Sequence, residues 1–331
     1  MERFALAAAV VLGFALTAAL CSLFVPLRRV LERREQNWQP VQSEQPRPAP
    51  LRAPLWGGLC AAAGTVAAVG VGWLAACVGQ PELLGSEGRL MTRLLTALAG
   101  SLAFGAVGLA EDLARMRSPA ALGLRRDVRL LLEALAAAFV LLLLRAAGCL
   151  PRGLGVPGAG YVLLGSAVPF LWAVLMVTLA ECARVAERDE GTVCGAAFAA
   201  MLALMMVEAG LGVPGLAVLP GALAGALVAL GLWAFPPAKL GAGCCGSLLA
   251  AGAIGCIPLS LDMTSLTVPL ALPFWAAGGL LAAQLLCAKR TGKPLRCWVK
   301  KHKMSPETVF LCSFALSAVG YVLALALLRW C

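Results

Sequence analysis

The sequence is poor in charged residues. Asp, Glu, Lys and Arg together make up 13% of the 331 residues, whereas hydrophobic residues make up 61%. A soluble globular domain has about 25% charged residues and roughly half apolar residues. The composition therefore excludes an ordinary soluble domain and predicts an all-α polytopic integral membrane protein.

Metal-ligand patterns are also missing. The chain contains one histidine, and its 13 cysteines are scattered without a CxxC pair, most of them inside apolar runs. We therefore expect neither a zinc site nor a disulfide framework, and interpret the cysteines as small apolar helix residues.

The net charge is +10. Basic residues that flank membrane spans explain this charge better than nucleic-acid binding does, so no nucleic-acid partner is predicted.

About ten apolar stretches are long enough to cross a hydrocarbon core of about 30 Å. The first has no small-residue cleavage site and is interpreted as a spanning helix rather than a signal peptide. No soluble domain fits between the stretches, so residues 1–331 are predicted to form a single transmembrane domain. The stretches run approximately from 4 to 25, 55 to 78, 94 to 110, 130 to 148, 161 to 180, 192 to 210, 214 to 235, 244 to 261, 265 to 287 and 308 to 330.

Basic residues predict the orientation of these spans. Lys and Arg concentrate in alternate loops, and short loops rich in Lys and Arg remain in the cytoplasm. Both termini are therefore predicted to be extracytoplasmic. The predicted cytoplasmic loops are about 26–54, 111–129, 181–191, 236–243 and 288–307.

A polar island interrupts two apolar runs between Trp233 and Ser247, with the sequence W-A-F-P-P-A-K-L-G-A-G-C-C-G-S. Closely spaced Pro and Gly are unusual in a buried helix. The island resembles the signature F-N-x-P-P-A-K-x-x-x-G-D-x-G-S of the polyprenyl-phosphate sugar-1-phosphate transferases (glycosyltransferase family 4), above all the phospho-N-acetylmuramoyl-pentapeptide translocases. Ala234 replaces the signature Asn and Cys244 replaces the signature Asp. The matching residues are Pro236, Pro237, Ala238, Lys239, Gly243, Gly246 and Ser247.

A second match lies in loop 111–129. Glu111, Asp112 and Arg115 stand where the family has D-D-Y-x-K, and Arg129 follows L-G-L at the family's spacing. Two adjacent carboxylates at the cytoplasmic end of a helix can bind Mg²⁺, which prefers oxygen ligands. The alternative is a solvated helix end with an i, i+4 pair between Glu111 and Arg115. The surrounding spacing favours inherited site geometry.

The third loop departs furthest from the family pattern. The family carries N-A-x-N-x-x-D-G-x-D-G, whereas this chain reads E-C-A-R-V-A-E-R-D-E-G from Glu181 to Gly191. Glu187 and Glu190 keep the negative charge on a longer side chain, and misplacement of a reacting group by 1 Å can cost about 10²-fold in rate. Arg184 puts a cation beside the expected metal site. A salt-bridged loop at the membrane edge is the alternative favoured here.

Two weaker matches complete the resemblance. Ala53 to Gly58 is similar to the family's T-P-T-M-G-G, without its threonines. The segment Arg296 to Pro306 is similar to a family stretch that contains several histidines, but here His302 lies among lysines. We interpret the latter segment as a basic surface that attracts anionic lipid.

The resemblance implies a reaction. Family members transfer a sugar phosphate from a UDP-sugar to polyprenyl phosphate with Mg²⁺, for peptidoglycan and cell-wall synthesis at the bacterial cytoplasmic membrane. By this resemblance Glu111 and Asp112 are the acidic pair and Asp112 the metal ligand, while Lys239, Arg129 and Arg115 contact phosphate. Cys244 stands where a second magnesium ligand belongs, and a thiol is a poor Mg²⁺ ligand.

These replacements predict a catalytically impaired paralogue, a pseudoenzyme with weak or absent Mg²⁺ binding. Its expected partners are polyprenyl phosphate, a UDP-sugar, and a second copy of the chain or another membrane enzyme. An active transferase with a site rebuilt from Glu187, Asp189 and Glu190 remains the alternative. A transporter is disfavoured, because within the spans only Glu133 and Glu208 stand out as ionisable, and both lie near helix ends.

Overall fold

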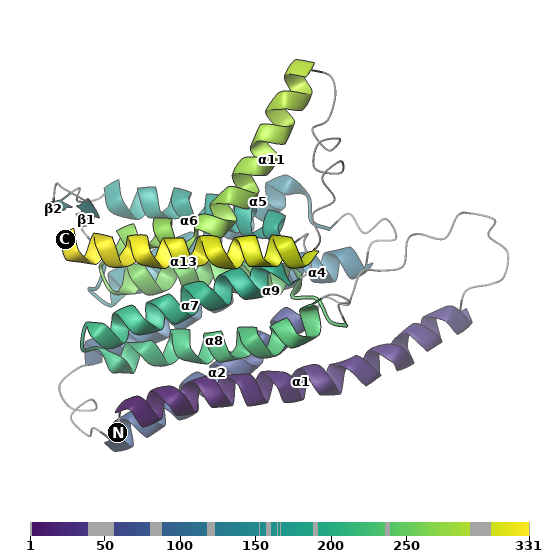
Figure 1. The fold of residues 1–331 in the computed structure, drawn as a ribbon, viewed down its shortest axis with the longest axis horizontal. Helices are drawn as coiled ribbons and strands as arrows, with labels where there is room; N and C mark the ends of the chain where they lie inside the picture. The colour runs from purple at the N-terminus through teal and green to yellow at the C-terminus, as the bar shows by residue number, and fades with distance from the viewer. Residues whose placement is uncertain are drawn as a thin grey trace.

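The computed structural model describes residues 2–38, 56–79, 88–117, 123–151, 153–156, 160–163, 165, 167–187, 191–235, 239–291 and 306–330. The fold is a bundle of long helices with one short hairpin (Figure 1). The helices are α1 (Glu2–Trp38), α2 (Gly57–Gly79), α4 (Gly88–Arg117), α5 (Arg126–Ala146), α6 (Ala167–Ala186), α7 (Thr192–Gly210), α8 (Pro214–Ala234), α9 (Gly243–Ser260), η1 (Thr264–Leu266), α10 (Thr267–Leu270), α11 (Leu272–Thr291) and α13 (Pro306–Trp330). The all-α polytopic class is confirmed.

The number of spans differs from the predicted ten. Within the described residues, eight helices are long and apolar enough to cross a membrane, or nine if the bent pair Thr264–Leu270 and Leu272–Ala283 is one span. Helix α5 occupies the predicted fourth span but carries Arg129, Glu133 and Arg145, which lowers its apolar character. The count of ten therefore stays a prediction.

The predicted start of the fifth span is wrong. Residues 161–163 do not begin a span but belong to strand β2 (Gly160–Leu163), which pairs antiparallel with β1 (Gly153–Val156). Helix α6 begins only at Ala167. The first span agrees with its predicted bounds, since its apolar part is Ala5–Val25, although α1 continues as helix to Trp38.

Helix α9 forms the centre of the bundle, and its whole length is buried. Its sequence is rich in Gly, Ala, Cys and Ser, and small residues let membrane helices approach closely. Helix α4 uses this space: a Cβ on Gly108 would collide with the backbone of Cys244, and a Cβ on Gly252 would lie 3.1 Å from the Cα of Ser101. This close packing places the end of α4 beside the start of α9.

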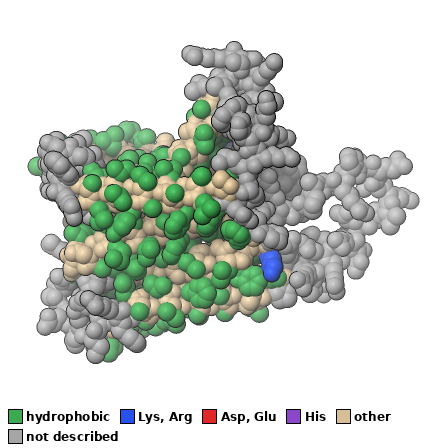
Figure 2. Space-filling view, in the orientation of Figure 1, with side chains coloured by type: hydrophobic (Ala, Val, Ile, Leu, Met, Phe, Trp, Pro, Cys, Tyr) green, Lys and Arg blue, Asp and Glu red, His purple; other side chains and the backbone are tan. Residues whose placement is uncertain are grey.

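Both chain ends lie at the same end of the bundle as the hairpin, and α11 tilts away from the other helices (Figure 1). The predicted common side of the termini is thus consistent with the fold, whereas its extracytoplasmic assignment stays a prediction. Over the face formed by α1, α8, α7 and α13, nearly all the described side chains are hydrophobic (Figure 2). Such a surface suits contact with lipid rather than water.

Candidate functional site

Asp112 caps a neighbouring helix. Its side chain is 1% exposed, and its Oδ1 and Oδ2 accept the backbone N–H groups of Cys244 at 3.0 Å and Cys245 at 2.9 Å. The first amides of a helix have no partner within the helix, and Ala242 at the N-cap of α9 offers no side-chain acceptor. Both carboxylate oxygens of Asp112 are therefore engaged in holding the start of α9.

Glu111 lies at the centre of a group of arginines. Its Oε1 is 2.9 Å from Nη2 of Arg115, 2.9 Å from Nη1 of Arg184 and 3.8 Å from Nη1 of Arg129. Only 2% of Glu111 is exposed, so these ion pairs are shielded from water. The guanidinium groups come from α4, α5 and α6, which makes Glu111 the point at which three helices are joined.

Glu181 joins two of the same arginines. It accepts Nε–H of Arg129 at 2.8 Å and Nη2–H of Arg129 at 3.3 Å, a two-bond geometry that suits a guanidinium and a carboxylate. Its Oε2 also accepts Nη2–H of Arg184 at 2.7 Å. Glu181 and Arg184 occupy the positions at which the family signature has asparagines, so ion pairs have replaced amides there.

Glu187 contacts the residue that replaces the signature Asp. Its Oε2 accepts the thiol of Cys244 at 3.1 Å and lies 3.7 Å from Nη1 of Arg115. The predicted salt-bridged character of this segment is therefore observed for Glu181, Arg184 and Glu187. Arg188, Asp189 and Glu190 lie outside the described residues.

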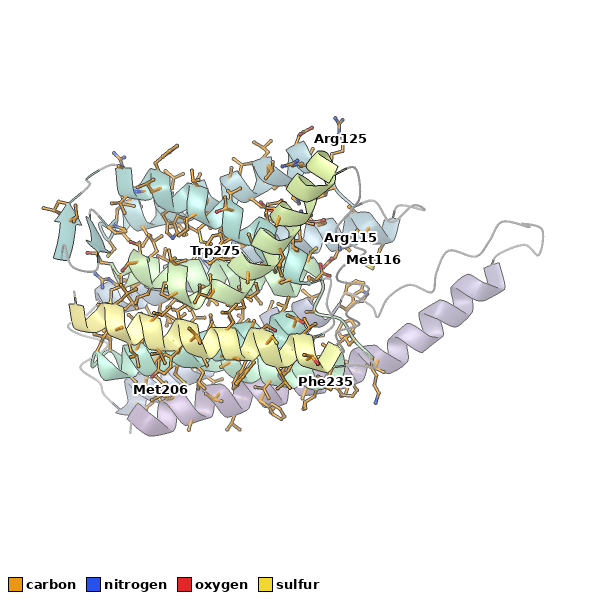
Figure 3. The ribbon with its side chains drawn as sticks, turned by 45° about the horizontal axis from the view of Figure 1, so that its top comes forward. Arg115, Met116, Arg125, Met206, Phe235 and Trp275 are labelled. Carbon is orange, nitrogen blue, oxygen red and sulfur yellow. The ribbon has the colours of Figure 1, made fainter. Side chains whose placement is uncertain are left out.

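The predicted phosphate partners differ in their surroundings. Side chains of Arg115 and Arg129 are 27% and 10% exposed, and both are held by carboxylates. Lys239 is exposed, with its Nζ 5.9 Å from the ring centroid of Trp233. Figure 3 shows Arg115 at the same end of the bundle as Phe235, which precedes the signature prolines. Pro236, Pro237 and Ala238 lie outside the described residues.

The weak match at Gly57 and Gly58 lies beside the signature loop, which is the part of the family signature between the end of α8 and the start of α9. The N–H of Gly57 donates to the carbonyl of Gly241 at 3.2 Å, and a Cβ on Gly58 would collide with the backbone of Gly246 and Ala242. Only a residue without a side chain fits at Gly58. The sequence match was weak by itself, and the packing gives it a physical reason.

Glu133 was not among the site residues predicted from the sequence. It lies on α5, one turn after Arg129, is 0% exposed, and neither of its carboxylate oxygens has a hydrogen-bond partner among the described residues. It interacts electrostatically with Glu181, Arg184, Arg129 and Glu111. The i, i+4 spacing from Arg129 to Glu133 was the available signal, because it puts both side chains on one helix face.

These side chains form what is called here the charged cluster: Glu111, Asp112, Arg115, Arg129, Glu133, Glu181, Arg184 and Glu187. In the part of the chain that the structure describes, no group of three or more His, Cys, Asp and Glu side chains is arranged to hold a metal ion. The chemistry that the geometry does support is capping and charge pairing among α4, α5, α6 and α9.

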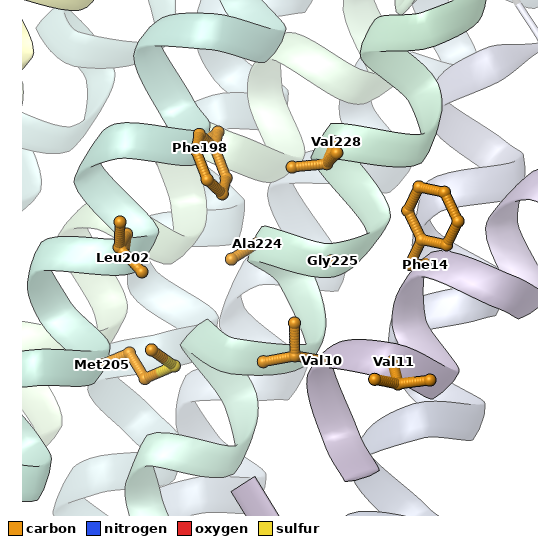
Figure 4. Close-up of a pocket in the computed structure, with 9 residues that line it drawn as sticks. All are labelled: Val10, Val11, Phe14, Phe198, Leu202, Met205, Ala224, Gly225 and Val228. Carbon is orange, nitrogen blue, oxygen red and sulfur yellow. The ribbon is translucent and has the colours of Figure 1, made fainter. Parts of the chain in front are cut away.

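An apolar pocket lies apart from this chemistry, between α1, α7 and α8, with a volume of about 380 Å³ (Figure 4). No ionisable side chain lines it, so it is suited to a hydrocarbon chain rather than to catalysis. Its lining residues are Val10, Val11, Phe14, Phe198, Leu202, Met205, Ala224, Gly225 and Val228.

Comparison with protein families gives one match. Residues 94–262 match the model of glycosyl transferase family 4, just over half of the chain. The matched region runs from within α4 to just past the end of α9 and includes the whole charged cluster. No curated protein matches the chain.

Proposed function

The chain belongs to glycosyl transferase family 4, and we propose that within this family it is a catalytically impaired member that binds a polyprenyl phosphate carrier without transferring a sugar phosphate to it. The family consists of membrane sugar-phosphate transferases that use polyprenyl phosphate and nucleotide sugars and are generally Mg²⁺-dependent. The resemblance to the phospho-N-acetylmuramoyl-pentapeptide translocases suggests the bacterial cytoplasmic membrane and cell-wall synthesis as its setting. One observation carries the proposal: the acidic pair is already bonded to the protein itself.

The residues present do not fit a magnesium ion. Mg²⁺ needs oxygen ligands at about 2.0–2.1 Å in an octahedral arrangement. Both oxygens of Asp112 accept amides of α9, and Oε1 of Glu111 holds two guanidinium groups at 2.9 Å. Cys244 offers a thiol, which is soft and mostly protonated, where an oxygen ligand is needed. We therefore derive no catalytic step through the metal.

The arginines of the cluster are likewise bound to carboxylates of the protein. Arg129 and Arg184 both bond Glu181, so a nucleotide diphosphate would have to displace that carboxylate before it could use them. Among the ion-paired groups, four carboxylates (Glu111, Asp112, Glu181, Glu187) face three guanidinium groups (Arg115, Arg129, Arg184), a formal charge of −1. A cluster with that charge does not attract a diphosphate.

Lys239 is the cation on which carrier binding would depend. It is exposed and belongs to the signature loop, and a cation at the headgroup level attracts anionic lipid by roughly 1 kcal/mol. The isoprenoid tail of the carrier requires only apolar helix surface, which this bundle offers widely. Lipid binding can therefore persist although the catalytic groups are bonded to one another.

An assay for release of uridine monophosphate tests the catalytic half of the proposal. Purified protein is incubated with Mg²⁺, a UDP-sugar and polyprenyl phosphate, beside an active translocase as the positive control. We expect no release above the protein-free background. Sustained turnover by the wild type would refute the proposal and favour an active site rebuilt around Glu187 and its neighbours.

Lipid analysis tests the binding half. Polyprenyl phosphate should co-purify with the protein in excess over bulk anionic lipid, and Lys239→Ala should reduce its amount. Arg125→Ala is the matched control, because Arg125 is an 86% exposed cation whose ion-pair partner, Asp127, is also exposed. Equal loss in both variants, or no enrichment in the wild type, would show that the signature-loop cation has no special role.

A further inference from the structure

Two buried cysteines face each other across α1 and α2, in a register set by small residues. A Cβ on Gly72 would lie 2.9 Å from the Cβ of Ala9, and a Cβ on Gly64 would collide with Thr17. Thr17 lies eight residues after Ala9, and Gly64 lies eight residues before Gly72, so the helices run antiparallel in step. One turn further on the same faces are Cys21 and Cys60, because residues i and i+4 of a helix share a face.

This register places the two thiols opposite each other. Cys21 and Cys60 are 0% and 1% exposed, both are free, and they interact electrostatically with each other. The close approach that Gly64 permits one turn away brings the two backbones together. A disulfide needs Cα atoms about 4.4–6.8 Å apart, and small residues at an interface let helix backbones approach closely.

We propose that Cys21 and Cys60 form an oxidisable dithiol that closes to a disulfide between α1 and α2. Each thiol loses one proton and one electron, the two sulfur atoms form the S–S bond, and a lipid-soluble quinone takes up both electrons and both protons to become a quinol. The quinone class follows from the setting: α1 and α2 are apolar enough to cross a membrane, where a quinone dissolves, and the buried thiols become accessible to it when the two helices separate.

Oxidation at this position acts on the signature loop. Cys60 lies in the first turn of α2, where the N–H of Gly57 donates to Gly241 and Gly58 packs on Gly246. A disulfide would tie α1 to the end of α2 that supports this loop. The oxidation state of the dithiol would therefore change how firmly the loop is held, whether or not the protein is catalytic.

Peptide mapping after oxidation tests the proposal on the full chain. Membranes that contain the protein are treated with a short-chain ubiquinone analogue, remaining thiols are blocked with N-ethylmaleimide, and the denatured protein is digested with trypsin. Cleavage after Arg28 and Arg52 separates a peptide whose only cysteine is Cys21 from a peptide that contains Cys60 and Cys77. We expect a linked pair of these peptides, two hydrogen masses lighter than their sum, which disappears on reduction.

Variants identify the partner. Cys60→Ala should abolish the linked pair, whereas Cys77→Ala, which removes another buried cysteine of α2, should preserve it. A link that survives in Cys60→Ala would refute the assignment, because Cys77 is the other cysteine of that peptide and would then carry the link. Absence of the link in the wild type with both the quinone and diamide, a small permeant thiol oxidant, would refute the dithiol. A link with diamide alone would refute the quinone as its oxidant.

Discussion

Replacing Asp112 by Ala is expected to destabilise the fold, whether or not the protein is an enzyme. The carboxylate is 1% exposed and accepts two backbone N–H groups of α9, at 3.0 and 2.9 Å. A hydrogen bond to a charged group contributes about 1.5–3 kcal/mol, and a buried donor left without a partner costs about 1–3 kcal/mol. Because these contributions overlap, we expect Asp112→Ala to lower the free energy of unfolding by about 3 kcal/mol.

Asp112→Asn should fall between the wild type and Asp112→Ala. An asparagine keeps one carbonyl oxygen for one of the two amides, but it turns its NH₂ group toward the other donor and removes the charge that stabilises a helix N-terminus. Lys239→Ala is the matched control, since substitution of an exposed side chain usually changes stability by no more than about 0.5 kcal/mol.

The measurement is unfolding of the detergent-solubilised variants by denaturant, together with hydrogen exchange of the peptide that contains the first turn of α9. Exchange at Cys244 and Cys245 should accelerate in Asp112→Ala and not in Lys239→Ala. If Asp112→Ala unfolds at the same denaturant concentration as Lys239→Ala, with unchanged exchange at these two amides, Asp112 does not cap α9 and our assignment fails.

Three further predictions follow from the charged cluster and the loops. Arg184→Ala should lower the free energy of unfolding by about 3 kcal/mol, because Glu111 and Glu181 each lose one of their guanidinium partners. Adding Glu111→Gln should recover part of this loss, and strict additivity in thermal unfolding would contradict the coupling. Cys244→Asp should give no measurable release of uridine monophosphate. It should also lower the melting temperature, because it puts a second carboxylate beside Glu187. Turnover by this single variant would show that the other replacements do not prevent catalysis. Cysteines introduced between Lys289 and Lys303, a stretch that lies largely outside the described residues, should be protected from impermeant reagents added outside intact cells, and labelling there would reverse the predicted orientation.

The membrane class and the positions of most helices could be predicted from the sequence. An apolar run of about 20 residues has few alternatives to a helix in a bilayer, because every backbone polar group must be bonded internally. The failures are local. Residues 161–163 belong to a strand although they were predicted to start a span, since short apolar runs do not distinguish helix from strand. The charges of α5, among them Arg129 and Glu133, face the charged cluster, which a count of apolar residues does not foresee.

The sequence by itself also determined the family, because the spacing from Pro236 to Ser247 is a covalent pattern that survives the loss of individual side chains. Only the tertiary structure decided what the acidic pair does. Whether Asp112 binds a metal or caps a helix depends on the approach of α4 to α9, which Gly108 permits against the backbone of Cys244. Which arginines Glu111 holds depends likewise on three helices meeting at one point. Ion pairs and caps act over a few ångströms between segments far apart in the chain, so their partners are set by helix packing and not by local sequence.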